Sequence, residues 1–240
     1  EQGKLTDELR ASIEAADTKN RLEDLYLPYK PKRRTKAQIA REAGLEPLAD
    51  TLYDDPDQDP ETVAAGYLNP EVGVEDIKAA LDGARYILME RFAEDAELLG
   101  ALRDFVWQEG QLKVTVVEGK ENEGAKFRDY FDHVEPLRKV PSHRALAILR
   151  GRNEGILAYS IVMGDAEEDR RQPHPAEQRI AAHWRIRDNG RAADKWLSDV
   201  VRWTWRVKLS TQIETDLIAQ VREAAETEAI NVFAANLKDL

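Results

Sequence analysis

The last 50 residues of the chain, from Arg191 to Leu240, contain neither glycine nor proline. Because these two residues most often interrupt or end a helix, the stretch can form one helix of about 75 Å at about 1.5 Å per residue, or two helices broken near Ser210 and Thr211. We predict a long connecting helix over 191–240. Its apolar side follows helical spacing and consists of Leu197, Val201, Trp205, Ile213, Leu217, Val221 and Ala225.

The rest of the chain also shows mostly helical patterns. Thr6, Thr18 and Thr35 stand where a helix N-cap is expected, and each is followed by apolar residues at helical spacing. Val74–Phe92 and Asp95–Glu109 have the pattern of two amphipathic helices. The sequence therefore predicts a mainly α fold, an irregular multi-helix array with a long C-terminal helix.

Extended structure is expected in few places, at most as a minor β element. Ile156–Met163 is the best strand candidate, and Leu112–Val117 fits either a strand or a last helical turn. A helix opened by Pro141 is expected to end by Leu149, before a loop that contains Gly151.

The stretch Leu27–Lys32 should be an extended strap. Pro28 and Pro31 fix two φ angles, and the residue before a proline avoids the helical region. Such a strap can pack its tyrosines while its cations stay in water.

A helix-turn-helix-like element is predicted within residues 35–73. Ala40 is followed by a turn glycine, Gly44, and an apolar Leu45, a spacing that packs two helices at a steep angle. The second helix carries Glu46 and Asp50, which would repel phosphate, so we favour a packing or protein-contact role over insertion into a DNA groove.

Composition restricts the chemistry that the chain can perform. It has 240 residues and no cysteine, which excludes disulfides and thiolate zinc sites and fits a reducing cytoplasm. No membrane segment and no targeting segment is recognisable. The chain starts without Met and stops inside a helical pattern, so we expect a fragment of a longer protein. We also expect the protein to be monomeric and cytoplasmic.

Two segments run against the overall charge. Lys plus Arg number 35 and Asp plus Glu 46, a net charge of −11, so any contact with nucleic acid must be local. The first basic segment is Asp24–Lys36 and the second is Pro136–Asn153, which has no acidic residue. Their candidate phosphate-binding residues are Lys30, Lys32, Arg33, Arg34, Lys36, Arg138, Lys139, Arg144, Arg150 and Arg152.

The role of these cations is open at this stage. They can neutralise phosphates without reading sequence, with Tyr26 or Tyr29 stacking on an unpaired base. They can equally pair with the abundant carboxylates and fix one helical module to the next.

Catalytic and metal-binding patterns are poor. Asp55, Asp57 and Asp59 imitate a calcium loop, but Pro60 stands where the sharp turn needs glycine. The remaining motifs show no nucleophile elbow, no phosphate loop and no paired histidine spacing. We therefore expect no catalytic residue, no metal and no cofactor.

Three long stretches closely resemble the bacterial Tex family of transcription accessory proteins: Leu22–Asp50, Glu118–Leu157 and the C-terminal tail from Glu214. The resemblance implies the N-terminal helical region of such a protein, ending where a YqgF-type, RNase H-like domain begins. It also implies a helix-hairpin-helix pair and an OB-fold RNA-binding module downstream, to which nucleic-acid binding is chiefly attributed.

The sequence thus predicts a non-catalytic architectural part of a transcription accessory protein that binds RNA or DNA, mainly through downstream domains. Weak phosphate contacts would come from the two basic segments. The alternative is a protein-interaction scaffold that docks on the transcription machinery.

Overall fold

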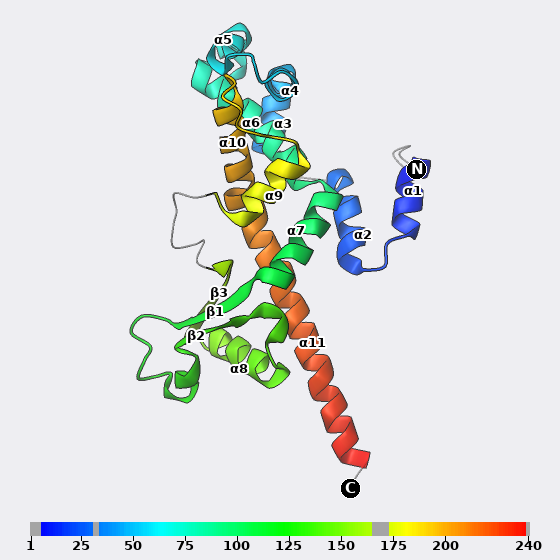
Figure 1. The fold of residues 1–240 in the computed structure, drawn as a ribbon, viewed down its shortest axis with the longest axis vertical. Coiled ribbons are helices and arrows are strands. Elements are labelled where there is room, and N and C mark those ends of the chain that lie inside the picture. The colour runs from blue at the N-terminus through cyan, green and yellow to red at the C-terminus, as the bar shows by residue number, and fades with distance from the viewer. Residues whose placement is uncertain (1–5, 31–33, 165–172, 239–240) are drawn as a thin grey trace. The chain divides into compact units, whose positions relative to one another are not determined.

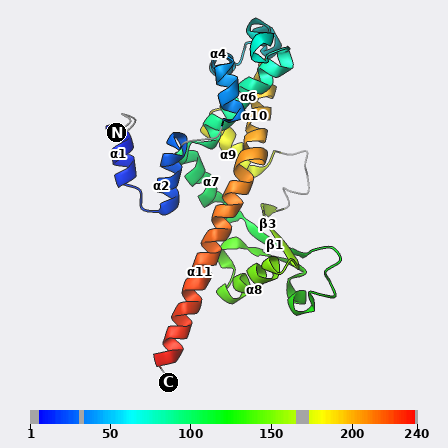
Figure 2. The same cartoon turned by 180° about the vertical axis from the view of Figure 1, so that it is seen from behind.

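The computed structural model describes residues 6–30, 34–164 and 173–238 (Figures 1 and 2). It divides into two compact units: unit 1 comprises Glu1–Ala101 and Ala176–Ser210, and unit 2 comprises Leu102–Pro175 and Thr211–Leu240. Helices dominate the described residues, with one small sheet among them. The prediction of a mainly α fold with a minor β element is confirmed.

Helices make up the secondary structure of unit 1 in its described residues, apart from one isolated β-bridge between Asn69 and Val74. Its elements are α1 (Asp7–Glu14), α2 (Lys19–Tyr26), η1 (Leu27–Tyr29), α3 (Lys36–Glu42), α4 (Glu46–Asp54), α5 (Pro60–Ala64), η2 (Ala65–Tyr67), η3 (Pro70–Val72), α6 (Ile77–Ala93), the first turns of α7 (Ala96–Glu109), α9 (Pro175–His183), α10 (Asp194–Trp203) and η7 (Thr204–Leu209).

Threonine caps open the first three helices. The hydroxyl oxygens of Thr6, Thr18 and Thr35 accept hydrogen bonds from the third amide along, at 3.1, 3.2 and 3.0 Å. Each bond satisfies one of the amides that a helix start leaves without a partner. The three predicted caps are confirmed.

The centre of unit 1 is the packing of α3 and α4 on α6. Leu48 and Leu52 of α4 and Ile87 of α6 have no exposed surface. Gly83 lets α6 approach closely, because a Cβ built there would lie 2.3 Å from Leu45 Cδ1 and 3.3 Å from Ala40 Cβ. A side chain at position 83 would therefore collide with a buried neighbour.

A charged network joins the same helices. Glu90 of α6 is 5% exposed; its carboxylate accepts from Arg41 Nη1 at 2.6 Å and from Thr35 Oγ1 at 3.0 Å. Burial alone would lower the pKa of Arg41, but the hydrogen bond and charge of Glu90, with those of Glu46, outweigh it and raise that pKa.

The prediction of an extended strap over Leu27–Lys32 is wrong at its start, and Pro31 and Lys32 lie outside the described residues. Leu27 keeps helical angles, φ −52° and ψ −44°, and Leu27–Tyr29 form the 3₁₀ helix η1 directly after α2. The disfavoured conformation before Pro28 is tolerated here, and Lys30 N donates to the carbonyl of Tyr26. The backbone first turns extended at Lys30, where ψ is 132°.

Within the stretch free of glycine and proline, helical structure begins at Asp194. The Asp194 carboxylate accepts from the amides of Asn189 at 2.7 Å and Arg191 at 3.0 Å, which holds the preceding turn out of the helix. α10 is followed by the π-helix η7 and then by α11 (Ser210–Lys238).

Unit 2 consists of the end of α7, a three-stranded antiparallel sheet, α8 and α11. Its elements are β1 (Gln111–Val116), η4 (Ala125–Tyr130), β2 (Asp132–Pro136), η5 (Leu137–Lys139), α8 (Ser142–Asn153), β3 (Leu157–Val162) and α11.

The strand order is β2-β1-β3, and β1 pairs with both neighbours. The stretch Leu112–Val117 is therefore a strand rather than a helical turn, and Ile156–Met163 contains the predicted one. On the outer side of β3, the amide of Ile161 donates to the Glu214 carboxylate of α11 at 3.0 Å. This side chain satisfies a donor that an edge strand otherwise leaves open.

Helix α8 packs against β3 and runs four residues further than expected. Gly151 lies inside it rather than in a loop. A Cβ at Gly151 would be 2.5 Å from Leu157 Cδ1 and 3.3 Å from Phe127 Cδ1, so this glycine serves close helix-to-sheet contact. The chain turns at Gly155, whose φ is +73°.

Candidate nucleic-acid interface

The described part of the first basic segment is largely exposed. Tyr26 and Tyr29 are 53% and 40% exposed, and Lys30 follows them in water. Lys30 forms no ion pair with the residues that the structure describes. Lys32 and Arg33 lie outside the described residues.

Two further cations of this segment are already engaged. Arg34 contacts Glu42 at 2.5 Å, and its hydrogen bond, followed by that of Gln38, lowers the pKa of the Glu42 carboxyl. Lys36 Nζ lies 4.9 Å from the centre of the Tyr86 ring and donates to its hydroxyl at 3.3 Å. Lys36 thus has a cation–π partner, and no acid among the described residues pairs with it.

The second basic segment begins in η5. Arg138 and Lys139 are both exposed there. Arg138 Nη1 donates to the neutral Gln108 Oε1 at 2.7 Å, so its charge is not compensated by that contact. Within the described ranges, neither cation forms an ion pair.

The arginines of α8 differ from one another. Arg144 pairs with Glu135 at 2.6 Å, and Arg150 pairs with Glu154 at 3.1 Å. Arg152 has no acidic partner in the part of the chain that is described; its guanidinium carbon lies 5.7 Å from the centre of the Tyr159 ring.

Glu154 serves two cations at once. Lys126 lies 2.5 Å from its second oxygen, and the hydrogen bond from Lys126 is the main reason why the pKa of Glu154 is lowered. The sequence did not predict which acids pair with these cations, because most of the acids are not three or four residues away along a helix. Only Arg150 and Glu154, four residues apart, carry a recognisable signal.

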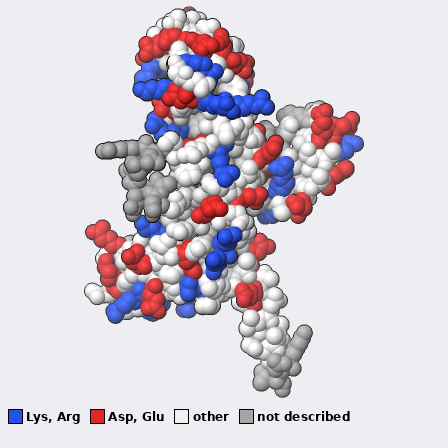
Figure 3. Space-filling view, in the orientation of Figure 1, with Lys and Arg blue, Asp and Glu red and all other residues white. Residues whose placement is uncertain are grey.

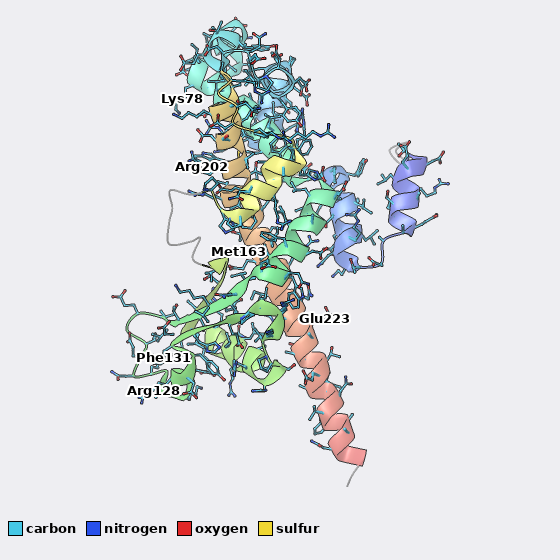
Figure 4. The ribbon with its side chains drawn as sticks, in the orientation of Figure 1. Lys78, Arg128, Phe131, Met163, Arg202 and Glu223 are labelled. Carbon is cyan, nitrogen blue, oxygen red and sulfur yellow. The ribbon has the colours of Figure 1, made fainter. Side chains whose placement is uncertain are left out.

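The predicted residues are divided between the two units. The first basic segment lies in unit 1 and the second in unit 2. In the view of Figure 3, lysines and arginines are interspersed with aspartates and glutamates rather than gathered into one positive field. Elsewhere too, cations pair along their own helices, as Lys78 does with Asp82 and Arg202 with Asp199. Figure 4 labels these two cations, Lys78 and Arg202.

The second helix of the helix-turn-helix-like element presents acid. A shallow hollow along α4 is lined by Glu46, Asp50, Asp54 and Asp55 with Pro47 and Thr51. Asp50 accepts from Arg91 at 2.6 Å, and Glu46 lies 3.4 Å from Arg41. Asp54 and Asp55 form no ion pair with the described residues, and their charge disfavours contact with phosphate at this surface.

The remaining candidate motifs have structural partners. Asp59 caps α5, since its carboxylate accepts from the amide of Thr62 at 2.8 Å. His183 Nε2 lies 3.1 Å from the Asp95 carboxylate, at the start of α7. Within the described residues, no group of three potential ligands is placed to hold a metal ion. Among the same residues, no helix combines the length and the apolar character needed to cross a membrane.

Comparison with known proteins places these residues in a family. The model of the Tex central region-like family matches residues 55–233. Protein YhgF of Escherichia coli (strain K12) is 60% identical over 240 residues, and the transcriptional accessory protein Tex of Neisseria gonorrhoeae is 58% identical over 240 residues. Both matches cover 100% of this chain and 31% of the relative, so the chain spans about a third of these proteins.

A more distant relative comes from a eukaryote. The human S1 RNA-binding domain-containing protein 1 is 27% identical over 248 residues, which covers 100% of this chain and 24% of that protein. With the family model matching about three quarters of the sequence, the chain belongs to the Tex family.

Proposed function

We propose that this chain is a non-catalytic architectural part of a transcription accessory protein that binds nucleic acid. The name of the Neisseria gonorrhoeae relative supports the link to transcription, and that of the human relative supports an association with RNA. The 29-residue helix α11 supports an architectural role, because a helix of this length is a rigid connecting element. We place the chain in the cytoplasm and assign it no cofactor.

Within that role, the basic segments make weak contacts with phosphate that are independent of sequence. The observation that carries this is local: Lys30, Arg138 and Lys139 are exposed and form no ion pair among the described residues, although the chain has a net charge of −11. Lysine and arginine at such positions release counterions when they meet a phosphate backbone, and they carry no information about bases.

One observation favours a second function, docking of a protein. Helices α1 and α2 with η1 border an open, mostly apolar hollow of about 480 Å³. Residues that line it are Leu9, Ile13, Leu22, Glu23, Leu25, Tyr26 and Tyr29. In this alternative the chain is a scaffold that docks on the transcription machinery, and its cations serve only to stabilise the fold through ion pairs.

Titration of the chain with labelled single- and double-stranded RNA and DNA at several salt concentrations tests the proposal. We expect binding that weakens as salt rises, and a further decrease when Lys30, Arg138 and Lys139 are all changed to Ala. The matched control changes Lys113, Lys195 and Lys208, three exposed lysines outside both segments that form no ion pair with the described residues, and should bind as the original chain does. No binding at low salt, with retained capture of RNA polymerase, would support the docking scaffold instead.

A further inference from the structure

The first two helices form a hairpin whose apolar side chains all remain in contact with solvent. α1 and α2 lie side by side in Figures 1 and 2, and η1 continues α2. No apolar residue within 6–30 is buried, and Leu22, Tyr26 and Tyr29 are 44%, 53% and 40% exposed. An amphipathic helix normally buries its apolar side against a neighbour, but nothing in the described part of the chain covers this one.

The hairpin is attached to unit 1 through the polar side of α2. Arg21 Nη1 donates to the carbonyl of Ala96, the first residue of α7, at 2.8 Å, and Asp24 is 4% exposed. Arg21 and Asp24 are three residues apart and share one side of α2, whereas Leu22 and Tyr26 share another. The attachment therefore leaves the apolar side of α2 turned toward the open hollow that it borders with α1.

The hollow has the shape of a groove between two helices. The side chains that line it at helical spacing are Leu9 and Ile13 of α1 and Leu22, Leu25 and Tyr26 of α2. Such a groove accepts a third helix whose apolar residues recur at positions i, i+3, i+4 and i+7. A third helix would also stabilise α1, because a helix of eight residues is marginal by itself.

The charges around the hollow indicate the chemistry of its partner. Residues 6–17, which form α1 and the connection after it, contain one arginine and four acids, Asp7, Glu8, Glu14 and Asp17. None of the four acids forms an ion pair with the described residues. On α2, Glu23 lines the hollow but is paired with Lys19 at 3.7 Å. A helix with lysines or arginines beside its apolar stripe would therefore gain favourable contacts along α1.

We propose that the hollow between α1 and α2 binds a basic amphipathic helix of another protein. The apolar stripe of that helix packs on Leu22 and Tyr26, and its cations lie along the acids of α1. The inference rests on the second function given above, docking of a protein, and it adds the chemistry of the docked segment. The phosphate contacts of the two basic segments do not depend on it.

Two other occupants suit the hollow less well. A second copy of this chain would offer the exposed Ile230 and Phe233 of α11, but Glu226 and Glu228 beside them would meet the acids of α1. An RNA base could stack on Tyr26, but the phosphates on either side of that base would meet the same acids.

Three labelled peptides of about 18 residues, long enough to form a helix, test the inference by fluorescence anisotropy with the 240-residue chain. The first has leucines at helical spacing flanked by lysines. The second has glutamates in place of the lysines, and the third has the composition of the first in an order without an apolar stripe. We expect the first peptide to bind and the other two to bind at least about tenfold more weakly. Amide shifts in NMR spectra should place the bound peptide at α1, α2 and η1.

The apolar contacts are tested by Leu22→Ala with Tyr26→Ala. This variant should bind the lysine peptide at least about tenfold more weakly, because two side chains that the peptide covers are removed. Both side chains are exposed in the free chain, so the variant should unfold at the same urea concentration as the original chain does.

The charge contacts are tested by Glu14→Lys with Asp17→Lys. Affinity for the lysine peptide should fall by about tenfold at low salt and by less at high salt. Glu14 is the last residue of α1 and Asp17 follows it, positions where a lysine favours the helix, so unfolding of α1 cannot cause the loss. The matched control is Glu75→Lys with Glu118→Lys, two exposed acids outside the helices with no ion pair in the described ranges, and it should leave affinity unchanged.

The inference is overturned if the lysine peptide does not bind, or if the glutamate peptide binds equally well. It is also overturned if Leu22→Ala with Tyr26→Ala abolishes binding of RNA, which would assign the hollow to a nucleotide, or abolishes self-association, which would assign it to a second copy. The proposed function is judged separately, by the oligonucleotide titration with Lys30, Arg138 and Lys139 changed, and its outcome does not depend on the peptides.

Discussion

Gly83 provides a sharp test of the packing in unit 1, through the substitution Gly83→Ala. Inside an α-helix, alanine is favoured over glycine by about 1 kcal/mol, so helix propensity alone predicts a more stable protein. The structure predicts the opposite. The new Cβ would lie 2.3 Å from Leu45 Cδ1, well inside the roughly 3.5–4.0 Å at which two carbons attract, and Leu45 is only 2% exposed.

The expected magnitude follows from these two opposing effects. Overfilling a packed core costs about 1–3 kcal/mol, so after the helix-propensity gain of about 1 kcal/mol the net decrease in unfolding free energy for Gly83→Ala should be about 0–2 kcal/mol. The matched control is Gly100→Ala in α7, which also belongs to unit 1. Its new Cβ would meet only Arg21 Nη1, at 3.6 Å, so that variant should gain about 0.5–1 kcal/mol.

Urea and thermal unfolding followed by tryptophan fluorescence measures both variants. Four of the five tryptophans, at positions 184, 196, 203 and 205, lie in unit 1. The two variants should differ by about 2 kcal/mol, or about 4–8 °C in melting temperature for a body of this size. If Gly83→Ala were as stable as Gly100→Ala, the close approach of α3 and α6 would be refuted.

Two further outcomes follow from carboxylates with identified partners. The Asp194 side chain is 1% exposed. Its burial would raise the pKa of the carboxyl, but hydrogen bonds from Arg191 and Asn189 outweigh that effect and lower the pKa. Asp194→Ala should therefore lower the free energy of unfolding by about 2–3 kcal/mol near neutral pH. Because the pKa of Asp194 is lower in the folded than in the unfolded protein, its contribution to stability is present above about pH 4 and is lost as the pH falls through the folded pKa. If Asp194→Ala destabilised the protein equally in strong acid, this reasoning would be contradicted. Removing the guanidinium with Arg34→Ala should raise the pKa of Glu42 toward its ordinary value in a carboxyl NMR titration, and an unmoved pKa would show that the pair is absent in solution.

Local signals predicted the helices well because their causes are local. Thr6 and Thr18 cap the helices that they precede, and β-branched residues mark the strand around Val114. Errors arose where a tertiary contact decided the outcome. Gly151 is typical of a helix end in sequence, yet it lies inside α8, at a position where Leu157 leaves no room for a side chain.

The candidate interface also separates what local sequence predicts from what tertiary contacts decide. Sequence alone located both basic segments, since an acid-free run such as Pro136–Asn153 is visible as composition. It could not tell which cations stay available. Arg34 meets an acid eight residues away and Arg144 one nine residues away, separations that no regular helix or strand brings into register.

A simple physical rule decides which cations of the second basic segment form ion pairs. An acid-free run excludes local partners, so its cations can be neutralised only by acids at its borders or from elsewhere in the fold. The border acids Glu135 and Glu154 pair with Arg144 and Arg150. Arg138, Lys139 and Arg152 have no acidic partner among the residues that the structure describes. In a chain with 46 acidic residues, whether a cation stays available is therefore decided by which carboxylates can reach it, and not by how many carboxylates there are.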